Sequence, residues 1–387
     1  MGEGAGHVDV QVTRLGSSSG AASVSLVTGD QAGVLPCNNS TGAASSRCDY
    51  ERRGATVDFA SGEISKTISV LIIDDAYVEG PETLTVTLAD PSGAGLGTPS
   101  TATVTIVDND STATGNPLND PSQRFFVGQN YLDFLNRQPD QGGWDFWTNS
   151  ITNCGSDLQC IEVHRINASA AFFLSIEFQG TGYLVERVYK TAYGDAIGTS
   201  VFGGSHSLPV PIVRLNEFLA DTQEIGNGVV VLQGNWEQQL EDNKNAFSAE
   251  FVQRPRFASA FPTTLTPVEF VDKLFSNAGF SPSSADRNAA INEFGGAGNT
   301  TSASARGRAL RRVAENPALS QNEFNRAFVL MQYFGYLRRN PNDPQDSDYT
   351  GYDFWLSKLN QFGGNYINAE MVKAFLSSIE YRQRFGP

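Results

Sequence analysis

Four carboxylates fall within nine residues of one stretch, Ile72–Glu82, in which a hydrophobic run is followed by acidic residues and a Gly–Pro turn. They are Asp74, Asp75, Glu79 and Glu82. At roughly 5 Å and an effective dielectric constant of about 20, each like-charged pair is destabilising by about 3 kcal/mol. The folded chain must therefore spread these groups into solvent or hold a cation among them. Calcium accepts six to eight oxygen ligands in a flexible shell, so the stretch is a candidate calcium site, and a solvated acidic turn is the alternative.

The overall charge argues against a nucleic-acid partner. The chain of 387 residues has 42 acidic and 27 basic side chains and a net charge of −15, whereas nucleic-acid backbones are bound through basic surfaces. The imbalance is strongest in residues 1–110, which contain 14 acidic and 5 basic residues. The length is sufficient for two or three domains. The three histidines are widely separated, which argues against a zinc or non-haem iron site.

The four cysteines form two local pairs, Cys37 with Cys48 and Cys154 with Cys160, each enclosing a polar segment. Local pairs of this kind predict disulfides and an oxidising compartment. Closing the first loop contributes roughly 3 kcal/mol on the chain-entropy description. Free thiols in a reducing compartment are the alternative. Neither pair has the CxxC spacing of a metal or redox motif.

No stretch of the sequence is long and apolar enough to span a bilayer. The first residues carry neither the basic region nor the hydrophobic run of a signal peptide. Together with the predicted disulfides, this indicates a secreted or cell-surface protein from which a leader has been removed, or a part of a longer chain.

The carboxylates must be positioned by the elements around them, and between His7 and Asp108 these elements have a period of two. Hydrophobic residues alternate with Thr and Ser in short runs, and Gly, Pro, Asn and Asp separate the runs. This pattern is typical of an antiparallel β-sandwich. The alternating hydrophobic positions are Val8, Val10, Val12, Val24, Leu26, Val57, Phe59, Ile64, Ile68, Val70, Ile72, Leu84, Val86, Leu88, Val104 and Ile106.

Several motifs follow one another in this region in an order typical of one family. They are Asp49–Tyr50, Phe59 with Gly62–Glu63, Ile72–Asp75, Glu79–Glu82 and Ile106–Asp110. These motifs resemble the Calx-beta domain, the calcium-binding domain of sodium–calcium exchangers and of many bacterial surface proteins. The resemblance implies a Greek-key β-sandwich over residues 1–110, with its acidic loops gathered at one end around Ca²⁺.

The resemblance also implies which residues are calcium ligands. Asn109 stands where strong multi-ion sites have a further aspartate, so we expect fewer ions or weaker binding. The chain begins at or inside the first strand of the family, so this strand is expected to be incomplete. The implied ligands are Glu3, Asp49, Asp74, Asp75, Glu79, Glu82, Asp108 and Asp110.

Residues 111–123 are polar and rich in Asn, Thr, Gly and Pro, which is typical of a linker. Because Asp108 and Asp110 lead directly into this segment, a bound calcium ion would also stiffen it.

After Arg124 the hydrophobic period becomes helical, and two segments are similar to each other. The segment from Phe126 to Phe178 matches the segment from Phe328 to Tyr381, including an aromatic motif at Gly143–Trp147 and Gly351–Trp355. We expect an all-α repeat domain with one helical unit at residues 124–245 and a second at residues 246–387.

The helical units resemble a family of bacterial domains of unknown function that occurs in secreted and surface proteins and has some likeness to phycobilisome linker domains. The resemblance rests on the two similar segments and on Phe251–Pro255 and Phe270–Asp272 between them. It implies a family but no biochemical activity.

The aromatic motifs have two interpretations. Trp144, Trp147 and Trp355 are expected in the core of each unit, and a sugar-stacking platform is the alternative. The acidic loop from Asp343 to Asp348 is expected to be solvated, with a second calcium loop as the alternative. No P-loop, nucleophile elbow or HExxH motif is present.

The sequence as a whole therefore predicts a non-enzymatic, extracellular calcium-binding protein with a structural or adhesive role. Calcium would rigidify the end of the β-sandwich and the linker, and the helical domain would serve self-association or surface attachment. The partners would be calcium and further copies of the chain, as a homo-oligomer or a head-to-tail fibre. The alternative is a carbohydrate-binding module that recognises a cell-surface glycan. An enzyme would require two carboxylates in a cleft of the helical domain.

Overall fold

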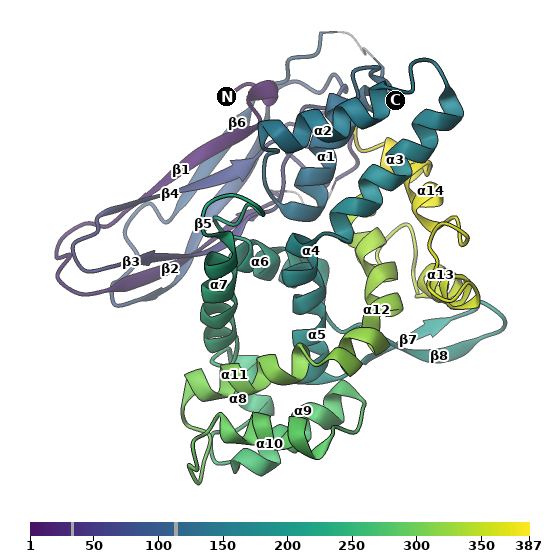
Figure 1. Cartoon of the computed structure of the whole chain (residues 1–387). Helices are drawn as coiled ribbons and strands as arrows, with labels where there is room; N and C mark the ends of the chain where they lie inside the picture. The colour runs from purple at the N-terminus through teal and green to yellow at the C-terminus, as the bar shows by residue number, and fades with distance from the viewer. Residues whose placement is uncertain (32–34, 112–114) are drawn as a thin grey trace. The chain divides into compact units, whose positions relative to one another are not determined.

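The computed structural model describes residues 1–31, 35–111 and 115–387. Two compact units make up the chain (Figure 1). The first comprises Met1–Phe173 with Val372–Pro387, and the second comprises Leu174–Met371. Residues 372–387 belong to the unit that contains the β-sheets, so this division differs from the expected boundary at residue 245. The predicted domain scheme stays a prediction.

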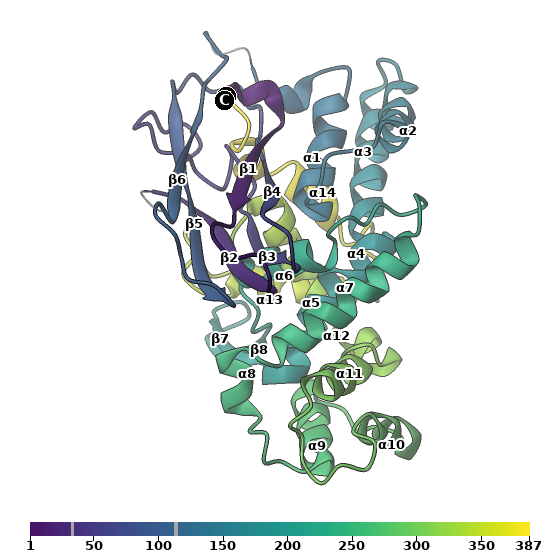
Figure 2. The same cartoon turned by 90° about the vertical axis from the view of Figure 1, so that its left-hand side faces the viewer.

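The first unit contains two antiparallel sheets (Figure 2). One sheet has the strand order β1-β4, and the other has the order β3-β2-β5-β6. The strands are β1 (His7–Thr13), β2 (Ala22–Gly29), β3 (Gly54–Phe59), β4 (Ser65–Leu71), β5 (Glu82–Ser92) and β6 (Thr101–Ile106). The β-sheet architecture expected at the N-terminal end is confirmed, and the Greek-key connection stays a prediction.

The alternation of side chains explains how these strands form a core. In β2, Val24, Leu26 and Thr28 are buried and the residues between them are more exposed. Hydrophobic residues of both sheets, from Val12 to Ile106, belong to one core cluster. Because successive side chains of a strand point to opposite faces, this period-two pattern directs one face of each sheet inward.

The first residues of the chain extend the edge of β6. The Met1 ammonium group donates to Thr105 O, Val107 N donates to Met1 O, and Glu3 N donates to Val107 O at 3.0 Å. The chain then passes through the short helix η1 (Glu3–Ala5) into β1 of the other sheet. Residues 1–3 therefore cover one end of an otherwise exposed strand edge.

The first unit also contains α1 (Arg124–Leu135), α2 (Gln141–Thr152), α3 (Leu158–Phe173) and α15 (Ile379–Arg382). Part of the expected linker is packed rather than solvated. Residues 112–114 of that linker lie outside the described residues. Beyond them, η2 (Pro117–Asn119) buries Leu118, and Arg165 of α3 donates to Gln123 Oε1 at 2.6 Å.

The second unit is mostly helical, as expected. Its helices are α4 (Ile176–Gly180), α5 (Gly182–Tyr193), α6 (Leu215–Ile225), α7 (Trp236–Phe251), α8 (Pro255–Ala260), α9 (Pro267–Ala278), α10 (Ser284–Asn292), α11 (Ala303–Ala314), α12 (Pro317–Gln332), the π-helical turn η3 (Tyr333–Leu337) and α13 (Thr350–Gln361), and α14 (Met371–Leu376) crosses the boundary between the units.

The expectation of an all-α region is wrong at one place, because β7 (Ala196–Ser200) and β8 (His206–Val210) form an antiparallel hairpin. Gly198 lies in the middle of β7 and faces Tyr349. A Cβ at this position would come within 2.5 Å of the Tyr349 ring. The missing side chain lets Tyr349 pack directly on the strand backbone.

The two similar segments share local features, although the repeat itself stays a prediction. Arg137 lies over the Tyr131 ring at 5.0 Å, and Arg339 lies over the Tyr333 ring at 5.3 Å. The first segment ends in the Ser175 helix cap, and Ser378 caps α15 of the second segment in the same way. Matching residues thus adopt matching local structures in both segments.

Both predicted disulfides are present in the structure. Cys37 and Cys48 have a Cα–Cα distance of 5.7 Å, and Cys154 and Cys160 one of 5.6 Å. The expectation that the tryptophans form the core is wrong, because Trp144, Trp147 and Trp355 are all partly exposed. None of the helices in the described ranges is both long and hydrophobic enough to cross a bilayer.

Candidate metal centre

The strand register brings the acidic residues of the β-sheets to one end. Antiparallel pairing places Glu82, the first residue of β5, opposite Ile106, the last residue of β6. Asp108 and Asp110 follow Ile106 directly, so they emerge at the end where Glu82 begins its strand. Glu79 lies three residues before Glu82 and reaches the same end.

The remaining carboxylates lie at the same end because of the strand pairing in the other sheet. The register between β1 and β4 pairs His7 with Leu71, so Glu3 before β1 lies near Asp74 and Asp75 after β4. An isolated bridge between Tyr50 and Ile72 then brings Asp49 to the same place. We call this set of eight carboxylates the acidic tip: Glu3, Asp49, Asp74, Asp75, Glu79, Glu82, Asp108 and Asp110.

Two groups of three carboxylates are close enough to share an ion. In each group, one oxygen from every residue lies within 4.8 Å of the others. Asp75 connects the two groups, because its backbone N–H donates to Glu3 Oε1 at 3.0 Å and its side chain lies near Glu79 and Asp49. The groups are Glu3, Asp108 and Asp110, and Asp49, Glu79 and Glu82.

Three carboxylates of the acidic tip are buried and incompletely satisfied. Asp49, Asp75 and Glu82 are 5%, 6% and 4% exposed. Within the described part of the chain, no donor group reaches Asp49 Oδ1, Asp75 Oδ2 or Glu82 Oε1 when the three carboxylates are ionised, and Asp49 and Glu82 can hydrogen-bond to each other only by sharing a proton. A buried carboxylate oxygen without a donor is strongly unfavourable. A cation bound among these oxygens would remove that penalty, so the residues present fit a calcium ion.

The electrostatics of the acidic tip show the same deficit of positive charge. Burial, and then neighbouring carboxylates, raise the pKa of Glu3 to about 7, of Glu79 to about 8 and of Asp75 to about 10. Burial also raises the pKa of Asp49 and Glu82, and the proximity of Asp49 raises the pKa of Glu82 further. Without a cation, the folded chain therefore favours protonated carboxyl groups here.

Asp108 and Asp74 are held differently. Burial opposes ionisation of Asp108, but backbone N–H groups outweigh it and lower its pKa. Glu79 N and Gly80 N donate to Asp108 Oδ2 at 2.7 and 2.8 Å. Asn109 Nδ2 donates to Asp74 Oδ1 at 2.7 Å. These bonds fix the two carboxylates at the rim of the site.

The structure thus brings together all eight residues that the resemblance implied, and their role as ligands stays a prediction. One residue that shapes this end was missed. Asp30 follows β2 and accepts hydrogen bonds from Tyr50 Oη, Ser46 N and Arg52. Its position was available from the topology, because β2 ends beside the start of β5. It holds the loop that carries Asp49.

The acidic loop in the second unit has a different arrangement. Asp343 pairs with Arg214 at 2.8 Å, and Asp346 pairs with Arg339 at 2.8 Å. Asp348 accepts a hydrogen bond from Thr350 N. Since these acids already have partners within the chain, the alternative of a second calcium loop loses its physical basis.

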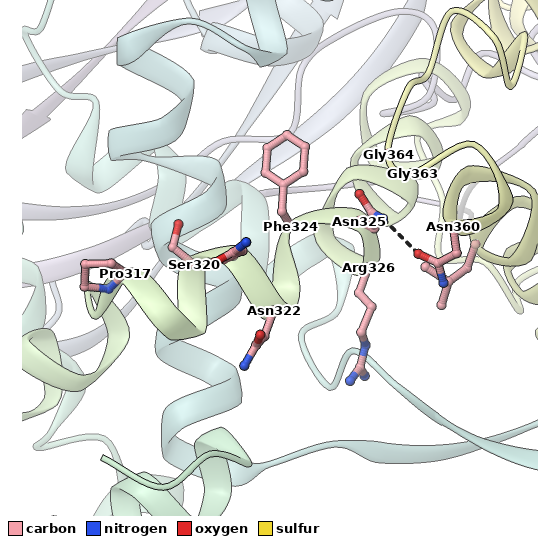
Figure 3. A pocket seen from close by; sticks show the side chains of 11 residues that line it. Pro317, Ser320, Asn322, Phe324, Asn325, Arg326, Asn360, Gly363 and Gly364 are labelled. Carbon is pink, nitrogen blue, oxygen red and sulfur yellow. Dashed lines mark hydrogen bonds between the residues drawn. The ribbon is translucent and has the colours of Figure 1, made fainter. Parts of the chain in front are cut away.

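A groove of about 710 Å³, lined by both polar and apolar groups, also lies in the second unit, along α12 and the end of α13 (Figure 3). Asn325 Nδ2 donates to Asn360 Oδ1 at 2.8 Å within it. The charged group on its wall, Arg326, is paired with Asp195 at 2.7 Å. Carboxamides and the ring of Phe324 form much of the remaining wall, a surface suited to a neutral, hydroxyl-rich ligand.

One cluster in the second unit contains the residue types of a catalytic triad. Ser200 Oγ donates to Asp353 Oδ2 at 2.6 Å, and His206 Nε2 lies 3.2 Å from the same oxygen. Both groups therefore contact the carboxylate. In a nucleophilic triad the serine would instead bond to the histidine, so this geometry does not correspond to one.

Comparison with protein families gives a match for the N-terminal region. Residues 1–110 match the Calx-beta domain family. This part of the chain is therefore similar to Calx-beta domains. The comparison with curated protein sequences gave no match.

Solved structures similar to this chain carry the same domain type. The apo-form Calx CBD1 domain is 31% identical, with 28% of this chain and 88% of that chain covered and a TM-score of 0.25. The calcium-binding domain CBD12 of CALX1.1 is also 31% identical, at 28% and 42% coverage and a TM-score of 0.25. The CBD12 of CALX1.2 is 33% identical, at 28% and 41% coverage and a TM-score of 0.25. The chain thus spans less than half the length of the two CBD12 structures.

Proposed function

We propose that residues 1–110, which match the Calx-beta domain, bind calcium through the acidic tip, and that the ion stabilises this end of a non-enzymatic, extracellular structural or adhesive protein. The observation that carries the proposal is the set of buried carboxylate oxygens on Asp49, Asp75 and Glu82 that no donor group in the described chain reaches when they are ionised. Hard cations with several oxygen ligands match this donor set.

Calcium would act by supplying the positive charge that the acidic tip lacks. The ion would be held by oxygens from the segments before β1, after β4 and after β6, together with Asp49. Because those segments are far apart in sequence, one ion would fix several loops at once. Affinity in the range of about 0.1–1 mM, typical of extracellular modules, is expected.

The extracellular part of the proposal draws its support from the two disulfides, which persist in oxidising compartments. The helical region would provide attachment or self-association. Head-to-tail fibres are a narrower form of this idea, in which a neighbouring chain pairs with the free part of the β6 edge. Light scattering with calcium present tests this form, and a monomer at every concentration would exclude it.

A calcium titration of the whole chain followed by calorimetry tests the main proposal. We expect heat of binding that saturates with calcium chloride and a higher melting temperature with calcium than with a chelator. A chain that releases no heat and melts at the same temperature in both conditions would refute calcium binding. The matched control is Asp343→Asn, which removes an acidic residue outside the acidic tip and should leave the titration unchanged.

Carbohydrate binding is the second candidate, and the groove in Figure 3 favours it. Its amide groups can donate to and accept from sugar hydroxyls, and Phe324 offers an aromatic edge. A glycan array tests this function directly. Phe324→Ala should then abolish binding, whereas Phe146→Ala, which changes an exposed ring in the other unit, should not.

A further inference from the structure

The last ten residues of the chain, 378–387, lie against the two loops that carry buried carboxylates of the acidic tip. This segment contains α15 and belongs to the same compact unit as the β-strands. It is distant in sequence from both loops, and it has no acidic residue among those proposed to bind calcium. Its contacts with the two loops are therefore independent of the proposed calcium ligands.

The first contact is with the loop after β4. Ala76, which follows Asp75 directly, donates its N–H to Phe385 O at 3.1 Å. The Tyr77 hydroxyl donates to Gln383 O at 3.1 Å. Gly386 permits this close approach, because its φ is +151° and an added Cβ would lie 3.3 Å from the Ala76 side chain. The backbone on either side of Phe385 is thus fitted to the loop that holds Asp75.

The second contact is with the loop before Asp49. The Arg47 guanidinium pairs with Glu380 at 2.8 Å, and both side chains are largely buried. Arg384 Nε donates to Arg47 O at 2.9 Å. Arg47 lies two residues before Asp49 and next to Cys48 of the first disulfide. The segment therefore contacts the main chain and side chain of a second loop of the acidic tip.

The segment is anchored by a buried ion pair. Arg384 is completely buried and pairs with Asp133 of α1 at 3.0 Å. Phe385 is also completely buried and packs edge-on against Phe125. Separating a buried ion pair leaves an uncompensated charge, which is strongly unfavourable. Residues 378–387 thus connect α1 to both loops through well-defined contacts.

We propose that calcium binding at the acidic tip and docking of residues 378–387 are coupled, so that each strengthens the other. The inference rests on the proposed function. Calcium would fix Asp49 and Asp75, and the loop residues that contact the segment, Arg47, Ala76 and Tyr77, are at most two residues away from these carboxylates. Loops held in the docked position have already lost the freedom that ion binding would otherwise remove. Thermodynamic linkage then requires that the segment raise calcium affinity by the same factor by which calcium favours docking.

Two changes to the whole chain test the coupling, with calcium chloride as the ligand. Ending the chain at Ser377 should lower calcium affinity by about 5- to 20-fold, within the usual range of coupling between sites. Tyr77→Phe removes only the hydroxyl that bonds to Gln383 O and should lower affinity by about 2- to 3-fold. Tyr193→Phe in the second unit is the matched control and should leave affinity unchanged.

Hydrogen exchange in the unaltered chain gives an independent readout. Amide exchange of residues 378–387 should slow by about 5-fold or more when calcium saturates the site. If the unaltered chain binds calcium but Tyr77→Phe has normal affinity and exchange of the segment does not respond to calcium, the coupling is wrong and the proposed function stands. If the unaltered chain binds no calcium, the proposed function and the coupling both fail.

Discussion

The acidic tip and the second unit handle their acidic residues in opposite ways. In the second unit, Asp195 lies 2.7 Å from both Lys190 and Arg326, and Glu323 lies 3.4 Å from Arg326. In the acidic tip, Asp75 and Glu82 are as buried as Glu323 but lie mainly among other carboxylates. The second unit contains its own counter-charges, whereas the tip needs a positive charge from solution.

This comparison shows that acid content alone does not identify a metal site. The loop from Asp343 to Asp348 is acidic, yet arginines neutralise two of its carboxylates. The decisive property is whether basic side chains lie beside the buried carboxylates, as Lys190 and Arg326 lie beside Glu323. The following predictions test that distinction, in order of expected effect.

Removing a counter-charge from the second unit should have the largest effect. Arg326→Met leaves Glu323 and Asp195 without their arginine and should lower the free energy of unfolding by about 3 kcal/mol. Urea denaturation measures this change. Calcium should not restore the loss, because Asp195 and Glu323 belong to none of the groups of described residues whose oxygens lie close enough to share an ion. Restoration by calcium would contradict the distinction between the units.

Calcium binding at the acidic tip should have the next largest effect on stability. At a calcium concentration 100 times the dissociation constant, the first unit should gain about 2.7 kcal/mol. Thermal unfolding followed by circular dichroism should show the transition move upward with calcium and return with a chelator. Magnesium at the same concentration should have a smaller effect, because it requires a tighter octahedral shell.

Glu82→Gln should stabilise the chain without calcium and should weaken the stabilisation that calcium provides. Without the ion, the substitution removes the free-energy cost of protonating Glu82 on folding and should stabilise the chain by about 1 kcal/mol at neutral pH. With the ion, calcium affinity should fall by about 10-fold or more, because a ligand oxygen loses its charge. Glu323→Gln is the control in the second unit and should destabilise the chain equally in both conditions. A Glu82→Gln protein that is destabilised without calcium would refute the assignment.

The pH dependence should also differ with and without calcium. The pKa values of Glu3 and Glu79 are raised in the folded chain, to about 7 and about 8 from 4.5. Their stabilising contribution is therefore complete below about pH 4.5 and is lost as the pH rises through 7 to 8. Without calcium, stability measured by urea denaturation should fall by at least about 1 kcal/mol between pH 5 and pH 8.5. Calcium affinity should rise over the same interval, because binding displaces protons.

Asn109→Asp should have the smallest effect. The substitution replaces the amide that donates to Asp74 with a further carboxylate. We expect calcium affinity to rise by about 2- to 5-fold and stability without calcium to fall slightly. Calorimetric titration of the variant beside the unaltered chain gives both quantities. Weaker calcium binding by the variant would place Asn109 outside the site.

Much of the β-sheet region could be predicted from the sequence, because short local patterns determine which residues are buried and where each strand ends. The alternation of Val24 and Leu26 fixes which face of β2 is buried, and acidic motifs at strand ends place Asp75 and Glu82 at the same end. The helical boundaries were less predictable. The helical period of the sequence does not show that α7 begins only at Trp236, after Leu232 and Gly234 have adopted positive φ values.

The parts that the sequence did not reveal depend on contacts between distant residues. In the β7–β8 hairpin, the Tyr349 ring packs against Gly198. No local sequence pattern predicts this contact. The packing of residues 378–387 depends on Arg384 meeting Asp133 and the backbone of Arg47. An arginine near the end of a helical segment gives no sign that it will be fully buried. Asp30 could have been included, since its strand ends beside Glu82.

The disulfide between Cys37 and Cys48 ends one residue before Asp49, so the backbone that presents this carboxylate is covalently tethered. Cleaving the bridge with a thiol would give the loop more conformations to lose when an ion binds. Ion affinity in this chain should therefore decline in a thiol-rich medium even though no cysteine is a ligand. The chain would then bind calcium at millimolar concentrations outside a cell, where the disulfide is intact. It would bind calcium more weakly in a reducing compartment, where the disulfide is cleaved.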